Sequence, residues 1–220
     1  MQLKYKNANA GLLMYMAVFL YIIGVMNNFR LRDNIDNVHL MLCILLPQIM
    51  VVIIVVLSLN YVLSDYNRIN KAHAFLYRNK ITIWKNNIIN CIKESAKGTL
   101  IVLIGICMYI IIVNAGKPEI YLILAAGGSA FAQLLISFMV IELMEWLFDI
   151  RWSGILIIVT MAIGDAFAFK VPLIYRRLYI AGDILNKNSG GIIIKLILAI
   201  VILSVIYIAG GVYSKNKEFL

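Results

Sequence analysis

Long apolar stretches occupy most of this chain, and they constrain its fold more than any other feature. A stretch of about 18–25 apolar residues is long enough to cross a bilayer as a helix. Of the 220 residues, 63% are hydrophobic and only 14% are charged. The sequence therefore excludes a soluble globular domain. It predicts an all-α polytopic membrane protein with one transmembrane domain covering residues 1–220.

Six membrane spans are predicted, at about residues 12–26, 40–63, 99–113, 120–148, 154–169 and 192–208. Pro47 in the second span indicates a kink, with a substrate contact as the alternative. The small residues of AAGGSA, residues 125–130, favour close approach of another helix, with a flexible gating point as the alternative. The semi-polar stretch between the last two spans predicts one or two short external re-entrant helices.

The stretch Asp65–Gly98 sets the orientation. It holds seven Lys or Arg residues against two acids, and cytoplasmic loops collect such residues near the span ends. We therefore expect this loop and both termini to lie in the cytoplasm. Glu142, Glu145 and Asp149, in the last turns of the fourth span and just beyond, are then expected at the inner membrane interface.

The second half of this loop has helical periodicity. Its apolar face repeats at intervals of three and four residues, through Ile81, Trp84, Ile88, Cys91 or Ile92, and Ser95. The pattern continues into the third span, with Gly98 as the one weak point. A single helix from Ile81 to Val113 would be about 50 Å long. The hydrocarbon core is about 30 Å thick, so we expect part of this helix to protrude or to bend along the interface.

The sequence lacks the common catalytic and metal-binding patterns. It contains no GxxxxGK[ST] phosphate loop and no HExxH. Its three cysteines and two histidines form no CxxC or Cys/His cluster. We predict no catalytic residue, no metal and no cofactor bound by this chain. The net charge of +9 is assigned to anionic membrane lipid rather than to nucleic acid.

Apart from Glu142 and Glu145 near the end of the fourth span, two charged residues lie within predicted spans, Asp165 and Lys195. Such residues are candidates for a substrate path by default, and both are expected in the outer half of the membrane. The alternatives are that Lys195 extends to the interface and that Asp165 caps external structure.

This layout resembles the six-span membrane subunits of type-2 ABC exporters. The resemblance covers the whole chain, and three stretches carry it. Residues 76–104, LYRNKITIWKNNIINCIKESAKGTLIVLI, are similar to the basic aromatic segment before the third span. FDIRW is similar to the very short loop after the fourth span, and VPLIYRRLYIAGDILN to the external re-entrant helices.

The resemblance implies a permease in the bacterial cell membrane. A separate ABC ATPase subunit would bind ATP and Mg²⁺, and a second permease chain, identical or related, would complete the pathway. The substrate would be hydrophobic or amphipathic, such as a peptide. The ATPase would bind a cytoplasmic coupling helix, with these residues implicated: Lys71, His73, Phe75, Leu76, Tyr77, Arg78 and Trp84.

A different class of protein is the rival hypothesis. The chain would then be a non-transporting membrane protein, either an accessory or assembly subunit or an intramembrane peptide-processing enzyme. The basic loop would only bind anionic lipid in that case. A neighbouring ATPase gene would favour the transporter. Loss of function in Cys91→Ser, with assembly intact, would favour the enzyme.

Overall fold

The computed structural model describes residues 2–33, 47–63, 80–112, 120–148, 151–167, 178, 183 and 189–216. The six secondary-structure elements in these residues are all helices. Their bounds are α1 Gln2–Asp33, α3 Pro47–Leu63, α5 Lys80–Ile112, α6 Ile120–Phe148, α7 Arg151–Phe167 and α10 Ser189–Asn216. The prediction of an all-α chain is therefore confirmed for the part that the structure describes.

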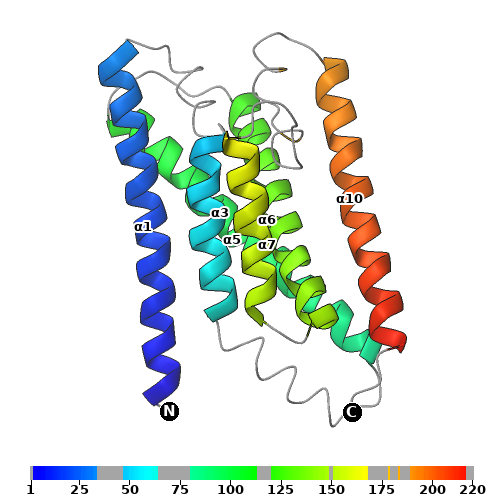
Figure 1. The fold of residues 1–220 in the computed structure, drawn as a ribbon. Coiled ribbons are helices and arrows are strands. Elements are labelled where there is room, and N and C mark those ends of the chain that lie inside the picture. The colour runs from blue at the N-terminus through cyan, green and yellow to red at the C-terminus, as the bar shows by residue number, and fades with distance from the viewer. Residues whose placement is uncertain are drawn as a thin grey trace.

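Successive helices run in opposite directions (Figure 1). The start of α1 and the end of α10 consequently lie at the same end of the bundle, which we call the base. The end of α3 and the start of α5 also lie at the base. Residues 64–79, which separate these two helices in the sequence, contain only the first part of the basic stretch Asp65–Gly98, and its second part is the start of α5. The arrangement fits the predicted placement of both termini and this loop on one side, although the side itself stays a prediction.

Four segments are long and apolar enough to cross a membrane, Gly11–Asn28, Lys80–Ile112, Ile123–Phe148 and Gly190–Lys215. Two shorter apolar segments, Ile49–Leu63 and Trp152–Met161, belong to α3 and α7. The described chain is thus a helical bundle with the dimensions of a membrane protein. The count of six spans stays a prediction.

The bounds of several elements agree with the sequence. Helix α6 spans residues 120–148 as predicted, and α5 is one continuous 33-residue helix, shifted by one residue from the prediction. Helices α1 and α10 extend beyond their predicted spans, because hydropathy locates only the apolar part of a helix. Described helix α3 begins at Pro47, a residue favoured in a first helical turn because its missing N–H is not needed there. The rest of the predicted span, residues 40–46, lies outside the described residues.

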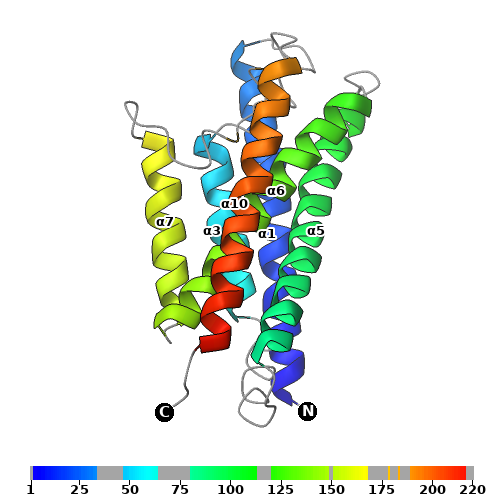
Figure 2. The same ribbon diagram turned by 90° about the vertical axis from the view of Figure 1, so that its right-hand side faces the viewer.

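Helix α5 crosses the bundle obliquely. In Figure 1 it begins near the end of α10 and finishes behind α1, and it contacts both of these helices and α6. Figure 2 shows α7 on the flank opposite α5, with α3 and α6 between them. A helix longer than the bilayer is thick can tilt to fit it, and α5 lies obliquely to the other helices as such a helix would.

Glycines allow the close helix contacts. Helix α5 continues through Gly98, where an added Cβ would lie 2.9 Å from a Leu57 carbon and 3.0 Å from a Leu134 carbon. The predicted close packing at AAGGSA is confirmed at Gly127, where an added Cβ would lie 3.1 Å from Leu103. At Gly154 an added Cβ would lie 2.6 Å from the Cα of Ile141. Small residues at these crossings allow helix backbones to approach in a bilayer.

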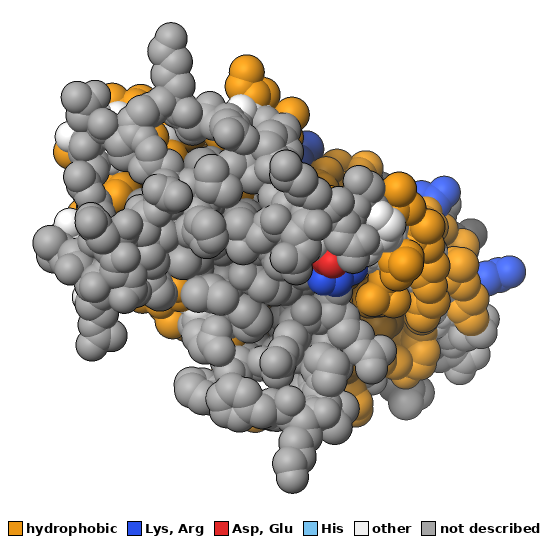
Figure 3. All heavy atoms as spheres, turned by 90° about the horizontal axis from the view of Figure 1, so that it is seen from above, with side chains coloured by type: hydrophobic (Ala, Val, Ile, Leu, Met, Phe, Trp, Pro, Cys, Tyr) orange, Lys and Arg blue, Asp and Glu red, His pale blue; other side chains and the backbone are white. Residues whose placement is uncertain are grey.

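The helices differ in how much of their surface the bundle covers. In the most apolar 18-residue segment of each helix, the buried share is 67% for α6 but only 11% for α10. Helix α6 is therefore central and α10 peripheral. Viewed from above, hydrophobic side chains cover the described flank of the bundle (Figure 3). Such a flank suits contact with lipid chains.

Candidate functional site at the base of helix α5

The first turns of α5 lie inside the bundle. Trp84, Ile88, Cys91 and Ser95 are buried, whereas the intervening lysines at positions 85 and 93 are exposed. The predicted apolar face is confirmed at these four positions. Ile81 and Ile92 are exposed instead, so Cys91 rather than Ile92 belongs to the buried face.

Trp84 joins α5 to the end of α10. Its side chain is 1% exposed, and its Nε1–H donates a hydrogen bond to the carbonyl oxygen of Tyr207 at 3.1 Å. The indole lies directly on Gly210, where an added Cβ would overlap the ring. We call this contact the Trp84–Gly210 notch. Because only glycine leaves room for the indole, the two helices are held in one relative position at the base.

A buried carboxylate joins helices α3, α5 and α6. Glu142 of α6 accepts a hydrogen bond from the hydroxyl of Tyr61 in α3, with 2.7 Å between Tyr61 Oη and Oε1. The side-chain amide of Asn87 in α5 donates to the other oxygen, Oε2, at 2.8 Å. Glu142 and Asn87 are 0% exposed and Tyr61 is 3% exposed. We call these three residues with Cys91 the Glu142 cluster.

The energetic importance of the cluster follows from its burial. Hydrogen bonds to charged groups contribute about 1.5–3 kcal/mol each, more than bonds between neutral groups. A buried carboxylate that loses its donors keeps a desolvation cost of several kcal/mol. Tyr61 and Asn87 therefore stabilise Glu142 and, through it, the contact between α3, α5 and α6.

Two further contacts fix the position of Tyr61. Its ring stacks on Phe138 of α6, with 4.7 Å between ring centroids and 9° between planes. Its hydroxyl also lies 3.3 Å from the Sγ of Cys91 in α5, within hydrogen-bonding distance for sulfur. The stacked pair adds about 0.5–1.5 kcal/mol beyond area burial. The hydroxyl is thus directed at Glu142 by contacts on both sides.

A second, more exposed contact joins α5 to α1. The hydroxyl of Tyr15 donates to Oε2 of Glu94 at 3.0 Å. Lys97 forms an ion pair with Oε1 of the same residue at 2.6 Å. The exposed Lys97 is separated from Glu94 by one helical turn, so its pairing adds only about 0.3–0.5 kcal/mol. The bond from Tyr15 is the one that connects two helices.

The cluster has hydrogen-bonding capacity that this conformation does not use. Oδ1 of Asn87 and the hydroxyls of Ser58 and Ser95 are buried without a hydrogen-bond partner among the described residues. Ser58 lies one turn from Tyr61, and Ser95 one turn from Cys91. Unsatisfied buried groups in a native structure call for a specific explanation. Here Ser58 belongs to α3, and Asn87 and Ser95 belong to α5.

The described residues include no group of three or more His, Cys, Asp or Glu side chains placed to hold a metal ion. Cys91 is fully buried, and its Sγ lies 3.3 Å from the hydroxyl of Tyr61. The cluster joins three helices through polar contacts.

Most of the predicted coupling residues fall outside the described part of the chain. This applies to Lys71, His73, Phe75, Leu76, Tyr77 and Arg78. Trp84 is described, and it lies in the bundle interior against α10. Asp165 belongs to helix α7, but its side chain is outside the described residues. The roles assigned to these residues stay predictions.

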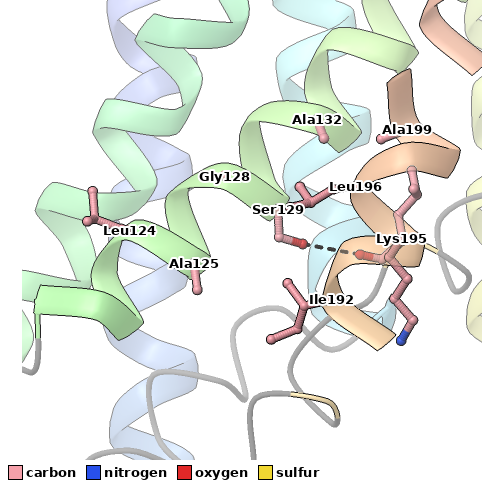
Figure 4. Close-up of a pocket in the computed structure, with 10 residues that line it drawn as sticks. Leu124, Ala125, Gly128, Ser129, Ala132, Ile192, Lys195, Leu196 and Ala199 are labelled. Carbon is pink, nitrogen blue, oxygen red and sulfur yellow. Dashed lines mark hydrogen bonds between the residues drawn. The ribbon is translucent and has the colours of Figure 1, made fainter. Parts of the chain in front are cut away.

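Lys195 lies beside a cavity of about 280 Å³ between α6 and α10. It forms an ion pair with Asp183, which precedes α10 in the chain. The hydroxyl of Ser129, on the cavity wall, donates a long hydrogen bond to the carbonyl oxygen of Leu178 at 3.5 Å, the dashed line of Figure 4. Lys195 and Asp183 thus occupy a position at the opposite end of the bundle from the Glu142 cluster.

Sequence reasoning missed the Glu142 cluster. Glu142 is expected from the sequence at the inner membrane interface, and the structure shows that α3, α5 and α6 enclose its side chain completely. Its donors are 81 and 55 residues away in the sequence, too far for a local pattern to reveal. One signal was present, a carboxylate within a continuous apolar run, which marks an intramembrane polar site.

We predict that Tyr61→Phe, which keeps the ring on Phe138 but removes the hydroxyl, lowers the free energy of unfolding by about 1.5–3 kcal/mol. The loss should shrink in a Glu142→Met background, because the acceptor is then absent. Denaturant unfolding in mild detergent measures both values. Tyr213→Phe alters an exposed tyrosine and should change stability by no more than about 0.5 kcal/mol. An equal cost in both backgrounds would contradict this role of Tyr61.

A pair of neighbouring glycines tests the Trp84–Gly210 notch. Gly210→Ala places a methyl group in the indole and should lower stability by about 1–3 kcal/mol, the usual cost of overpacking. Gly211→Ala is the matched control, because its nearest Trp84 atom would lie at 3.9 Å, an ordinary contact. In a Trp84→Leu background the cost of Gly210→Ala should disappear. Thermal unfolding followed by size-exclusion chromatography distinguishes the variants, and similar losses at both glycines would rule the notch out.

In comparisons with protein families, curated proteins and solved structures, none matches the chain. A functional hypothesis therefore rests on the geometry of the α5 base and on the layout of the sequence.

Proposed function

We propose that this chain is the membrane-spanning permease subunit of an ATP-driven exporter similar to type-2 ABC exporters. A separate ABC ATPase subunit would bind residues 71–78 and supply ATP hydrolysis. A second permease chain would complete the pathway. The substrate would be hydrophobic or amphipathic, with a peptide exported from a bacterial cell as the leading candidate.

One observation carries the proposal: the base of α5, which is the second part of the basic stretch Asp65–Gly98, is joined to α3, α6 and α10. The joints are the Trp84–Gly210 notch to α10 and the Glu142 cluster to α6 and α3. A rigid helix of 33 residues transmits a displacement at one end along its whole length. A subunit that moves Lys80 would consequently move α10 and α6 as well.

The buried polar atoms of α3 and α5 that have no hydrogen-bond partner support the proposal that α5 moves. Packed helices shift between discrete positions by small translations or rotations. A shift of α5 against α3 would bring Ser58, Ser95 or Oδ1 of Asn87 to new partners. The present conformation would then be one of two, with its unsatisfied groups compensated in the other.

The proposal is tested by co-purification. We would express the chain with its genomic neighbours and purify it in mild detergent. An ATPase subunit should accompany it and should be lost from a Phe75→Asp, Arg78→Glu double variant, because the loop loses both an apolar and a basic contact. The matched control is Ile120→Asp with Lys117→Glu, which makes the same charge change near the opposite end.

Release by the loop variant alone, with the chain still monodisperse, is the expected result. Two outcomes would overturn the proposal. In one, no ATPase accompanies the unaltered chain. In the other, both double variants release the ATPase equally, which would show that binding does not depend on the loop.

A further inference from the structure

The cavity between α6 and α10 has a wall built from small residues. Ala125, Gly128 and Ala132 line it from α6, and Ala199 lines it from α10. A Cβ added at Gly128 would meet no atom within 4 Å, so the space at this glycine is open. Figure 4 shows Ala132 of α6 opposite Ala199 of α10. The small side chains thus leave room that larger ones would fill.

The size and lining of the cavity limit what fits it. Ligand sites measure about 300–1,000 Å³, and this cavity, at about 280 Å³, lies just below that range. Leu124, Ile192 and Leu196 make the remaining lining largely apolar. A single narrow hydrocarbon chain suits this volume and this lining.

One charged side chain borders the apolar lining. Lys195 contributes to the cavity and is paired with Asp183, whose side chain is 15% exposed. In Figure 4 the amino group of Lys195 is directed away from Ser129, toward the start of α10. The cation is therefore near one end of the apolar space. This is the arrangement that an amphiphile with an anionic head would match, because its chain and its charge would each meet a complementary surface.

We propose that this cavity binds one hydrocarbon chain carrying an anionic head group, and that Lys195 exchanges Asp183 for that head. The shared chemistry belongs both to an anionic phospholipid and to a free amphiphile such as a fatty acid. This ligand site lies at the opposite end of the bundle from the Glu142 cluster. Binding there does not require an ATPase partner or transport.

Asp183 has a defined part in this exchange. It supplies the negative charge that Lys195 requires when no ligand is present, since an unpaired charge in apolar surroundings is costly. A bound anion competes with it for the same amino group. Removing the Asp183 carboxylate should consequently strengthen binding of an anionic chain, whereas removing the Lys195 charge should weaken it.

The test uses the full chain in nanodiscs of phosphatidylcholine with a diazirine analogue of palmitic acid. Photolysis followed by peptide mass spectrometry locates the attached probe. We expect saturable labelling of α6 and α10 that excess palmitate displaces. Labelling of α1, whose flank is exposed, should be non-saturable and insensitive to competitor.

Two glycines with open space provide a matched pair. Gly128→Leu fills the cavity and should reduce the saturable labelling at least about tenfold, a difference of 1.4 kcal/mol in affinity. Gly24→Leu adds the same side chain to α1, where an added Cβ also meets nothing within 4 Å, and should leave labelling unchanged. Equal labelling in both variants would overturn the proposal.

Charge variants test the head group. Lys195→Gln should weaken competition by palmitate about tenfold and leave competition by palmityl alcohol unchanged. Asp183→Asn should strengthen competition by palmitate. The two variants should therefore change competition by palmitate in opposite directions. If both variants weaken competition by palmitate and by palmityl alcohol alike, Lys195 and Asp183 only maintain the structure and the proposal fails.

The source of the ligand is resolved by the competitor. Displacement by phosphatidylglycerol alone assigns the site to membrane lipid, and displacement by palmitate alone assigns it to a free amphiphile. Displacement by both supports the shared chemistry. If neither displaces the probe, the labelling is non-specific and the site does not exist.

Discussion

A single buried carboxylate holds the interior of this bundle in its present arrangement. Glu142 lies on α6 and takes hydrogen bonds from α3 and α5 on its two oxygens. In a membrane, apolar contacts between helices compete with equally apolar lipid chains, so packing and hydrogen bonds determine which helices associate. A carboxylate without donors would be strongly unfavourable there. The positions of Tyr61 and Asn87, and thus of their helices, follow from this requirement.

The other contacts extend this arrangement to the periphery. The stacking of Tyr61 on Phe138 directs the hydroxyl, and Gly98 lets α5 pack closely against Leu57 of α3 and Leu134 of α6. The Trp84–Gly210 notch then attaches α10, a helix that is otherwise little covered by the bundle. Helix α5 takes part in the cluster and in the notch, so polar contacts from α3, α6 and α10 meet near its base.

Periodicity and hydropathy predicted the helices well, because both are local properties. The 33-residue α5 and the bounds of α6 follow from apolar runs and from spacings of three and four residues. The polar site was not predictable in the same way. Trp84 and Tyr207 are 123 residues apart, and the need for glycine at 210 is visible only when the indole is in place. Glu142 was assigned to the interface because a carboxylate near a helix end ordinarily reaches water. Its donors on two other helices remove that need. The coupling residues 71–78 lie outside the described part of the chain and stay predictions.

The native thiol of Cys91 offers the most direct measurement of this interior. With Cys43 and Cys107 replaced by alanine, the rate at which a membrane-permeant maleimide modifies Cys91 reports how often the cluster opens. We predict slow modification in the otherwise unaltered chain, and at least about tenfold faster modification in Glu142→Ala, corresponding to 1.4 kcal/mol less stability against opening. A variant that retains only Cys107, which is partly exposed, sets the rate for an accessible thiol. If Cys91 reacts as fast as Cys107 while Glu142 is present, the carboxylate does not hold the bundle closed.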